Sequence, residues 1–83
     1  MVYSITYKSS VHRDLKKLSK DVAIRVLDAI EKDLSVNAHK YPALKGAFAG
    51  LRKFRIGDYR VMYVLIDDTV LVLRIVHRRE VYR

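Results

Sequence analysis

Six basic or imidazole side chains toward the C-terminal end of the chain are the residues best suited to chemistry. They interrupt three apolar runs, and a tyrosine follows near the end of the chain; the set is Arg52, Lys53, Arg55, Arg60, His77, Arg78 and Tyr82. Guanidinium and ammonium groups bind phosphate, and imidazole exchanges protons near neutral pH. The set therefore predicts a site for a polyanion, with RNA or DNA as the leading candidate.

The apolar runs that carry these residues have the composition of strands. Each run is rich in β-branched and aromatic residues, and a short turn separates it from the next. Gly57-Asp58 and Asp67-Asp68 form the two turns, because glycine tolerates a positive φ and aspartate is frequent in turns. The pattern predicts strands over residues 51–56, 59–66 and 69–76.

The first half of the chain predicts one more strand, over residues 2–7, and then two helices. The apolar stripes of the helices are Val11, Leu15 and Leu18, and then Ala23, Leu27, Ile30 and Leu34, with Ile24 and Val26 widening the second stripe. We expect the second helix to stop at Asn37 and residues 39–50 to form a loop. The predicted fold is α+β, with a helical hairpin packed on a mostly antiparallel four-stranded sheet. Its order is β-α-α-β-β-β, in a single domain spanning residues 1–83.

The composition is that of a small basic domain without cysteine chemistry. The 83 residues carry a net charge of +8, and residues 40–83 hold ten Lys or Arg against four Asp or Glu, a net of +6. There are no cysteines, and the three histidines are scattered, so we expect no metal and no other cofactor. No apolar stretch reaches the ~20 residues of a membrane span, and no signal peptide is recognisable, so we expect a cytoplasmic protein.

Two-residue turns place several of the cations on one face of the sheet. With such turns Arg55 lies opposite Arg60, and Arg60 lies opposite Ile75. Opposed residues share a face, so four side chains are predicted to project together: Lys53, Arg55, Arg60 and His77. The opposed arginines repel each other, and a phosphate between them removes that repulsion. The tyrosines Tyr59 and Tyr63 fall on the opposite face, where we expect them to cover the core.

Three segments carry a family resemblance. They are Leu44-Lys45-Gly46, residues 52–63 (RKFRIGDYRVMY) and residues 76–82 (VHRREVY). With these segments the chain resembles the RelE/ParE toxin superfamily, and within it the RelE-like ribonucleases of type II toxin–antitoxin pairs. The order of elements agrees along the whole chain. The second and third segments are fairly specific together, and either alone is weak.

The resemblance implies a metal-independent endoribonuclease that cleaves mRNA, typically in the ribosomal A site. It also implies a cognate RelB-like antitoxin that silences the enzyme, so the expected partners are this antitoxin, mRNA and the ribosome. Carried over by position, Lys53 matches an active-site lysine and Arg60 matches the phosphate-binding arginine. Arg78 matches the arginine near the leaving group, and Tyr82 matches the C-terminal tyrosine.

Metal-free RNA cleavage needs a base for the 2′-OH proton, cations for the dianionic phosphorane and an acid for the 5′-oxygen. Arg60 and Arg78 suit charge stabilisation, because arginine stays protonated. The non-catalytic alternative for Arg60 is a structural ion pair with Asp58 or Asp67, and for Arg78 it is a solvated charge near the end of the chain. His77 is a candidate base, or else a hydrogen-bonded histidine at a strand end. Lys53 is a candidate acid or electrostatic group.

The remaining candidates are assigned to RNA binding. Tyr82 holds the 2′-OH or stacks on a base, unless it seals the terminal strand. Arg52, Arg55 and Lys45 are predicted to contact the RNA backbone. Enzymes of this family often have a second lysine at the position of Leu51. Either Arg52 or Arg55 takes over its electrostatic role, or the proton transfer differs.

Two other functions remain open on the sequence alone. ParE-type members of the same fold are non-catalytic and inhibit DNA gyrase, but such members usually lack the basic, tyrosine-containing C-terminus of this chain. The departure at Leu51 also leaves room for a catalytically degenerate member that binds RNA without cutting it.

Overall fold

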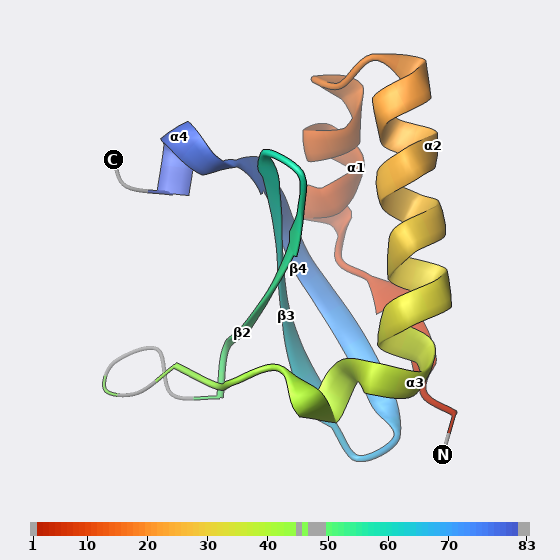
Figure 1. Ribbon diagram of the computed structural model, residues 1–83, viewed down its shortest axis with the longest axis vertical. Coiled ribbons are helices and arrows are strands. Elements are labelled where there is room, and N and C mark those ends of the chain that lie inside the picture. The colour runs from red at the N-terminus through yellow and green to blue at the C-terminus, as the bar shows by residue number, and fades with distance from the viewer. Residues whose placement is uncertain (1, 45, 47–49, 82–83) are drawn as a thin grey trace.

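The computed structural model describes residues 2–44, 46 and 50–81 of the chain (Figure 1). Its strands are β1 (Ser4–Tyr7), β2 (Arg52–Ile56), β3 (Tyr59–Ile66) and β4 (Thr69–His77). Its helices are α1 (Ser9–Lys16), α2 (Lys20–Ala29), the π-helical turn η1 (Ile30–Leu34), α3 (Ser35–Asn37), the 3₁₀ turn η2 (Ala38–Lys40) and α4 (Arg78–Val81). Among the described helices, none has the length and apolar character needed to cross a membrane.

The four strands form a single sheet in the order β1-β4-β3-β2. β1 runs parallel to β4, and the other neighbours are antiparallel. Helices α1 and α2 cover one face, whereas α4 projects on the opposite side of the sheet (Figure 1). The predicted α+β architecture is therefore confirmed, including both hairpin turns. Gly57 and Asp67 take the positive φ values of 56° and 55° that these tight turns require.

The second helix buries part of the predicted stripe, namely Val26, Ile30 and Leu34, and extends it to Ala38. Ser19 caps its start by accepting a hydrogen bond from the amide of Val22 at 3.3 Å. The residues that reach zero or one per cent exposure lie four apart: Val26, Ile30, Leu34 and Ala38. Steps of four residues overshoot a 3.6-residue turn, so this stripe would drift around a regular α-helix; the wider π turn η1 takes up the drift. As a result the helical run continues past Asn37 to Lys40, in what was expected to be loop.

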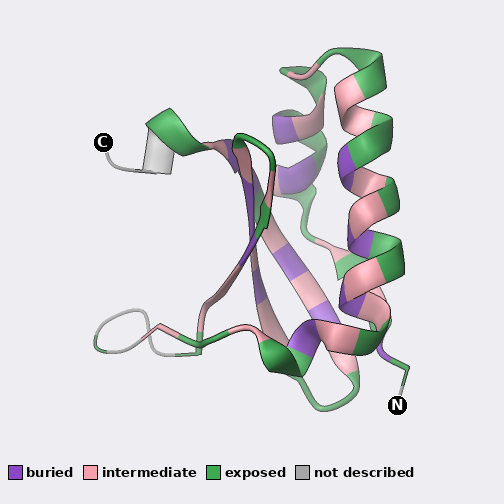
Figure 2. Ribbon diagram, viewed as in Figure 1, coloured by how far each residue is buried: buried purple, intermediate pink, exposed green. Residues whose placement is uncertain are grey.

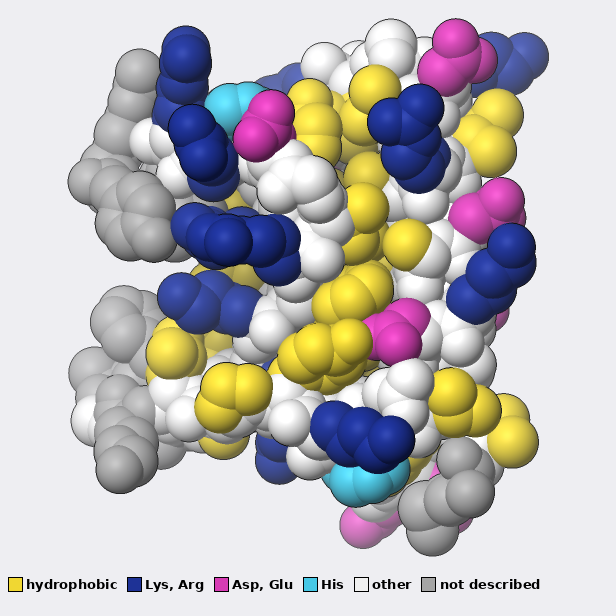
Figure 3. All heavy atoms as spheres, viewed as in Figure 1, with side chains coloured by type: hydrophobic (Ala, Val, Ile, Leu, Met, Phe, Trp, Pro, Cys, Tyr) yellow, Lys and Arg dark blue, Asp and Glu magenta, His cyan; other side chains and the backbone are white. Residues whose placement is uncertain are grey.

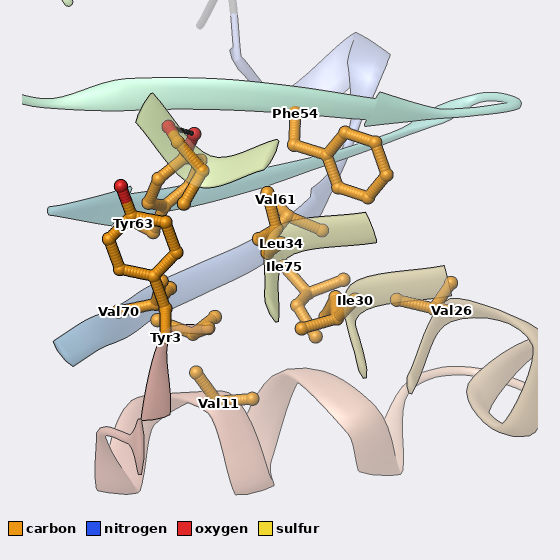
Figure 4. Packing of buried hydrophobic residues seen from close by; sticks show 12 residues of the cluster. Tyr3, Val11, Val26, Ile30, Leu34, Phe54, Val61, Tyr63, Val70 and Ile75 are labelled. Carbon is orange, nitrogen blue, oxygen red and sulfur yellow. Dashed lines mark hydrogen bonds between the residues drawn. The ribbon is translucent and has the colours of Figure 1, made fainter. Parts of the chain in front are cut away.

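The core fills the layer between the helices and the sheet (Figures 2 and 4). Tyr63 lies at its centre with no exposed surface, and its hydroxyl donates a hydrogen bond of 2.6 Å to the carbonyl of Ala38. Burial raises the pKa of Tyr63 to about 12, although Arg52 acts in the opposite direction. This tyrosine is thus a hydrogen-bond donor within the core, on the face of the sheet opposite the cations, as predicted.

A β-bulge interrupts β4 at Leu73. The register pairs Met62 with Arg74 and then Tyr63 with Val72, so Leu73 is an extra residue on β4. In a regular strand, successive carbonyls point to opposite edges. At this bulge two successive carbonyls accept hydrogen bonds from the segment that follows β1: Val72 from the amide of Lys8 at 2.9 Å, and Leu73 from the hydroxyl of Ser10 at 2.6 Å.

Asp14 of α1 completes this edge of β4. Its carboxylate is only 4% exposed and accepts a hydrogen bond from the amide of Ile75 at 2.9 Å. Its two oxygens also accept from the Arg74 guanidinium at 2.8 and 3.0 Å, a bidentate ion pair. Ser10 and Asp14 lie four residues apart and so share one face of the helix. Helix α1 thereby satisfies the backbone of β4 beyond the point where β1 ends.

We predict that Asp14→Ala lowers the free energy of unfolding by about 3 kcal/mol, because it leaves the buried Ile75 amide without its acceptor and removes the bidentate partner of Arg74. Urea unfolding followed by circular dichroism measures the change. The control is Asp28→Ala, which removes an exposed carboxylate from α2 and should stay within about 0.5 kcal/mol of the wild type. Equal unfolding midpoints for the two variants would contradict the role of Asp14.

Candidate functional site

The face of the sheet turned away from α1 and α2, which we call the open face, carries the cations. Phe54 and Val61 pack in the core, so the alternate positions on their strands point the other way. These positions are Lys53 and Arg55 on β2 and Arg60 on β3. Lys and Arg side chains gather on this side of the molecule in the space-filling view (Figure 3).

Arg55 and Arg60 are direct cross-strand partners, as predicted. The Gly57-Asp58 turn fixes this register. The two side chains differ in exposure, because Arg55 is exposed whereas Arg60 is 8% exposed. Val76 lies opposite Arg60 on β4 and is also 8% exposed, although it is not part of the core cluster between helices and sheet. The open face therefore combines a buried guanidinium with an exposed one over an apolar neighbour.

His77 does not share this face, and its predicted position is wrong. The expected register set Arg60 opposite Ile75, whereas the structure sets Arg60 opposite Val76 and Tyr59 opposite His77. The physical reason is the extra residue Leu73, which shifts every later position of β4 to the other side. The imidazole packs edge-on against the Tyr59 ring, with centroids 5.3 Å apart, on the helix side of the sheet.

Arg78 lies just beyond the end of β4, beside the turn that joins β2 to β3. Its amide donates a hydrogen bond of 2.7 Å to the carbonyl of Asp58, and its Nε lies 3.8 Å from the Asp58 carboxylate. Both side chains are more than half exposed, at 59% and 66%, so this ion pair leaves the guanidinium accessible. Helix α4, which begins at Arg78, projects on the open-face side in Figure 1, and we call its position beside the β2–β3 turn the rim of that face.

The remaining residues of the predicted site lie away from the open face or outside the described residues. Arg52 points to the helix side, where its guanidinium donates to the carbonyls of His39 (3.3 Å) and Tyr41, so it anchors the end of the helical run. Leu51 is half-buried and precedes β2. Lys45 and Tyr82 lie outside the described residues, and their assignments stay predictions.

Asp14 is the residue that the sequence reasoning missed. It falls in phase with the apolar stripe of the first helix, three residues after Val11 and four before Leu18, and an acid at such a position signals a buried ion pair. No sequence signal marked the bulge at Leu73. Within residues 2–44, 46 and 50–81, no three histidine or acidic side chains gather as a metal site would require.

The described part of the open face suits electrostatic stabilisation of a phosphodiester. Arg55, Arg60 and Lys53 share the face, and Arg78 stands at its rim. Arg74, the cross-strand partner of Met62, also falls on this side of β4, but its guanidinium is bound to Asp14 of α1. The described strand positions of the face bear no acid. Guanidinium matches phosphate oxygens in pairs and stays charged, whereas the ammonium of Lys53 is able to exchange a proton. The face therefore offers charge stabilisation at several points and one proton-exchanging group.

The comparisons with known proteins identify the family of the chain. A family model described as the ParE toxin of the type II toxin–antitoxin system parDE matches residues 5–82. The chain belongs to the RelE/ParE superfamily of type II toxins. Two relatives from Mycobacterium tuberculosis match along nearly all of this RelE/ParE toxin.

Toxin RelG is 33% identical over 86 residues, covering 100% of this chain and 99% of its own length. Toxin RelE is 30% identical over 84 residues, covering 98% and 87%. The crystal structure of the M. tuberculosis RelBE2 toxin–antitoxin complex contains a chain that superposes with a TM-score of 0.84 at 30% identity, covering 94% of this chain and 100% of that one. Sequence and fold therefore give the same family.

We predict that Arg55→Gln stabilises the isolated toxin by about 0.5 kcal/mol at low ionic strength, because it removes the like-charge pair with Arg60. Inorganic phosphate should raise the melting temperature of the wild type more than that of the variant. Arg25→Gln, which neutralises an exposed arginine on α2, is the matched control. If the two variants respond alike with and without phosphate, the open face does not concentrate positive charge.

Proposed function

We propose that this type II toxin is a metal-independent endoribonuclease that cleaves mRNA, with the ribosomal A site as the place of action. One observation carries the proposal: Lys53, Arg55 and Arg60 project together from two neighbouring strands onto a face without described acids. Basic side chains that converge in this way suit a polyanion, whose negative charge offsets their mutual repulsion. The resemblance to RelE-like ribonucleases supplies the reaction, and the names of the RelG and RelE relatives support that branch of the superfamily.

The reaction assigns a role to each cation. The 2′-hydroxyl gives its proton to solvent and attacks the adjacent phosphorus, the bond to the 5′-oxygen breaks, and that oxygen takes a proton from the protein. Arg60 and Arg78 stabilise the charge of the phosphorane, and Arg55 holds the RNA backbone beside them. Lys53 donates the proton to the leaving oxygen, since it is the proton-exchanging group among the described cations of the open face. Tyr82 remains the candidate for holding the 2′-hydroxyl.

A cognate antitoxin is the expected protein partner of this toxin. The structural relative at 30% identity is a toxin–antitoxin complex. The chain itself has a net charge of +8, which favours an acidic partner segment. Its 83 residues bury limited surface on folding, so a partner that binds the folded state adds stability by mass action.

Inhibition of DNA gyrase is the second candidate function. The description of the matching family model, a ParE toxin, favours it. A gyrase inhibitor would need no leaving-group chemistry, so substitution of Lys53 would not affect it through proton transfer. A supercoiling assay with purified gyrase separates the two functions, because the proposed ribonuclease leaves supercoiling unchanged.

We predict that the purified toxin cleaves a translated message in the presence of EDTA and leaves 2′,3′-cyclic phosphate and 5′-hydroxyl ends. Primer extension locates the cuts, and sensitivity of the ends to a cyclic phosphodiesterase identifies them. Cleavage that requires Mg²⁺, or products with 5′-phosphate ends, would exclude attack by the 2′-hydroxyl.

We predict further that Lys53→Ala lowers the cleavage rate by about 100-fold. Lys53→Arg should remain nearly as impaired, because arginine keeps the charge but does not release a proton near neutral pH. Lys32→Ala removes an exposed lysine from the helical side and is the control, with an expected change below about twofold. Full activity of Lys53→Arg would show that the residue acts by charge alone.

A further inference from the structure

The imidazole of His77 caps the start of α4. Its Nδ1 accepts a hydrogen bond from the backbone amide of Arg79 at 3.2 Å. Arg79 is the second residue of α4, so His77 stands where a helix N-cap side chain stands. A ring nitrogen accepts a hydrogen bond only when it carries no proton. This contact therefore requires a neutral ring with its proton on Nε2.

Few other interactions hold α4 in place among the described residues. The helix spans four residues, a length that is not stable by itself in water. Arg78 connects it to the β2–β3 turn through the amide bond to the Asp58 carbonyl and the exposed ion pair with the same residue. An exposed ion pair contributes little. Among the described contacts of α4, the imidazole bond is one of two hydrogen bonds that join the helix to β4 and the β2–β3 turn.

The groups around the ring bear charges of both signs. On the helix side, His77 and Tyr59 line a cavity of about 90 Å³ together with Asp14, Lys17, Leu18 and Ile75. Asp14 is already bound to Arg74 and to the Ile75 amide. Three further charged residues lie near the ring. Arg78 and Arg79 follow His77 in the chain, and Asp58 precedes Tyr59, the cross-strand partner of His77. Protonation of Nδ1 places its N–H group against the N–H group of the Arg79 amide. The hydrogen bond is then lost, whichever way the neighbouring charges shift the protonation of the ring.

We infer that His77 is a positioning residue whose neutral imidazole docks α4 and thereby holds Arg78 at the rim of the open face. When the ring is protonated at lower pH, Nδ1 becomes a donor, the Arg79 amide loses its acceptor, and α4 undocks. When the pH rises and the ring loses its proton, the cap forms again. The link to cleavage rests on the proposed function, in which Arg78 stabilises the phosphorane, but the docking itself does not.

Asparagine separates this role from direct catalysis. It is among the best helix N-cap residues and does not titrate, so His77→Asn keeps an acceptor for the Arg79 amide at every pH. His77→Ala offers no acceptor and serves as the uncapped state. A ring that acted as the base on RNA would be replaced by neither residue.

The first test is nuclear magnetic resonance on the isolated ¹⁵N-labelled toxin. At about pH 8 the ring nitrogen shifts should identify the Nε2–H tautomer of His77, and on lowering the pH to about 5 the Arg79 amide resonance should move with the His77 titration. The exposed His12 is the internal control, because its titration should leave Arg79 unaffected. In His77→Asn the Arg79 amide should be insensitive to pH. A proton on Nδ1 at pH 8, or an Arg79 amide that ignores the His77 titration, would overturn the inference.

The second test is the cleavage rate as a function of pH. The wild type should lose activity on the acid side, His77→Asn should lack that loss and keep nearly full activity at neutral pH, and His77→Ala should be about fivefold slower throughout. A His77→Asn protein with docked α4 but with less activity than His77→Ala would show that the imidazole takes part in the chemistry. If the resonances follow the expected pattern and none of the proteins cuts RNA, the proposed function fails and the docking role stands.

Discussion

The carboxylate of Asp14 is the interaction on which the arrangement of this toxin depends. β1 ends at Tyr7, and beyond it no strand of the described residues pairs with the edge of β4. The side chains of Ser10 and Asp14 supply the missing partners for Leu73 and Ile75, so α1 takes the place of a strand. Because buried backbone groups must be paired, this substitution allows β4 to contain a bulge and still continue to His77.

The bulge divides β4 into two halves with opposite assignments of faces. Before it, Val70 and Val72 pack in the core in the register that the Asp67-Asp68 turn sets. After it, Ile75 packs in the core, and Val76 lies beside the cations of the open face. A strand without the extra residue would exchange these faces and bring His77 beside Arg60. The distribution of chemistry over the two sides of the sheet thus follows from one unpaired residue.

Most of the fold and the β2–β3 part of the site can be predicted from the sequence, because they depend on local patterns of residue types. The Arg55–Arg60 pair depends on the Gly57-Asp58 turn, which is recognisable from these two residue types alone. The place of His77 depends on Leu73, whose extra position is stabilised by residues sixty or more positions earlier in the chain. Local patterns do not encode such a long-range partner. The burial of every fourth residue from Val26 to Ala38 is likewise not predicted by the pattern of a regular α-helix, because it requires a π turn.

The open face combines a rigid part with a part that is less firmly held. Lys53, Arg55 and Arg60 sit on paired strands, so their relative positions are set by the ladder of β2 and β3. Arg78 sits on a four-residue helix that touches the same hairpin through Asp58. Opening the described contacts of α4 costs less than opening a strand ladder, because Arg78 and Arg79 are exposed whereas a ladder pairs many backbone groups. An arginine that adds to a cluster of like charges is thus carried by an element whose contacts open more readily than a strand ladder, which lets its distance from the three strand cations adjust.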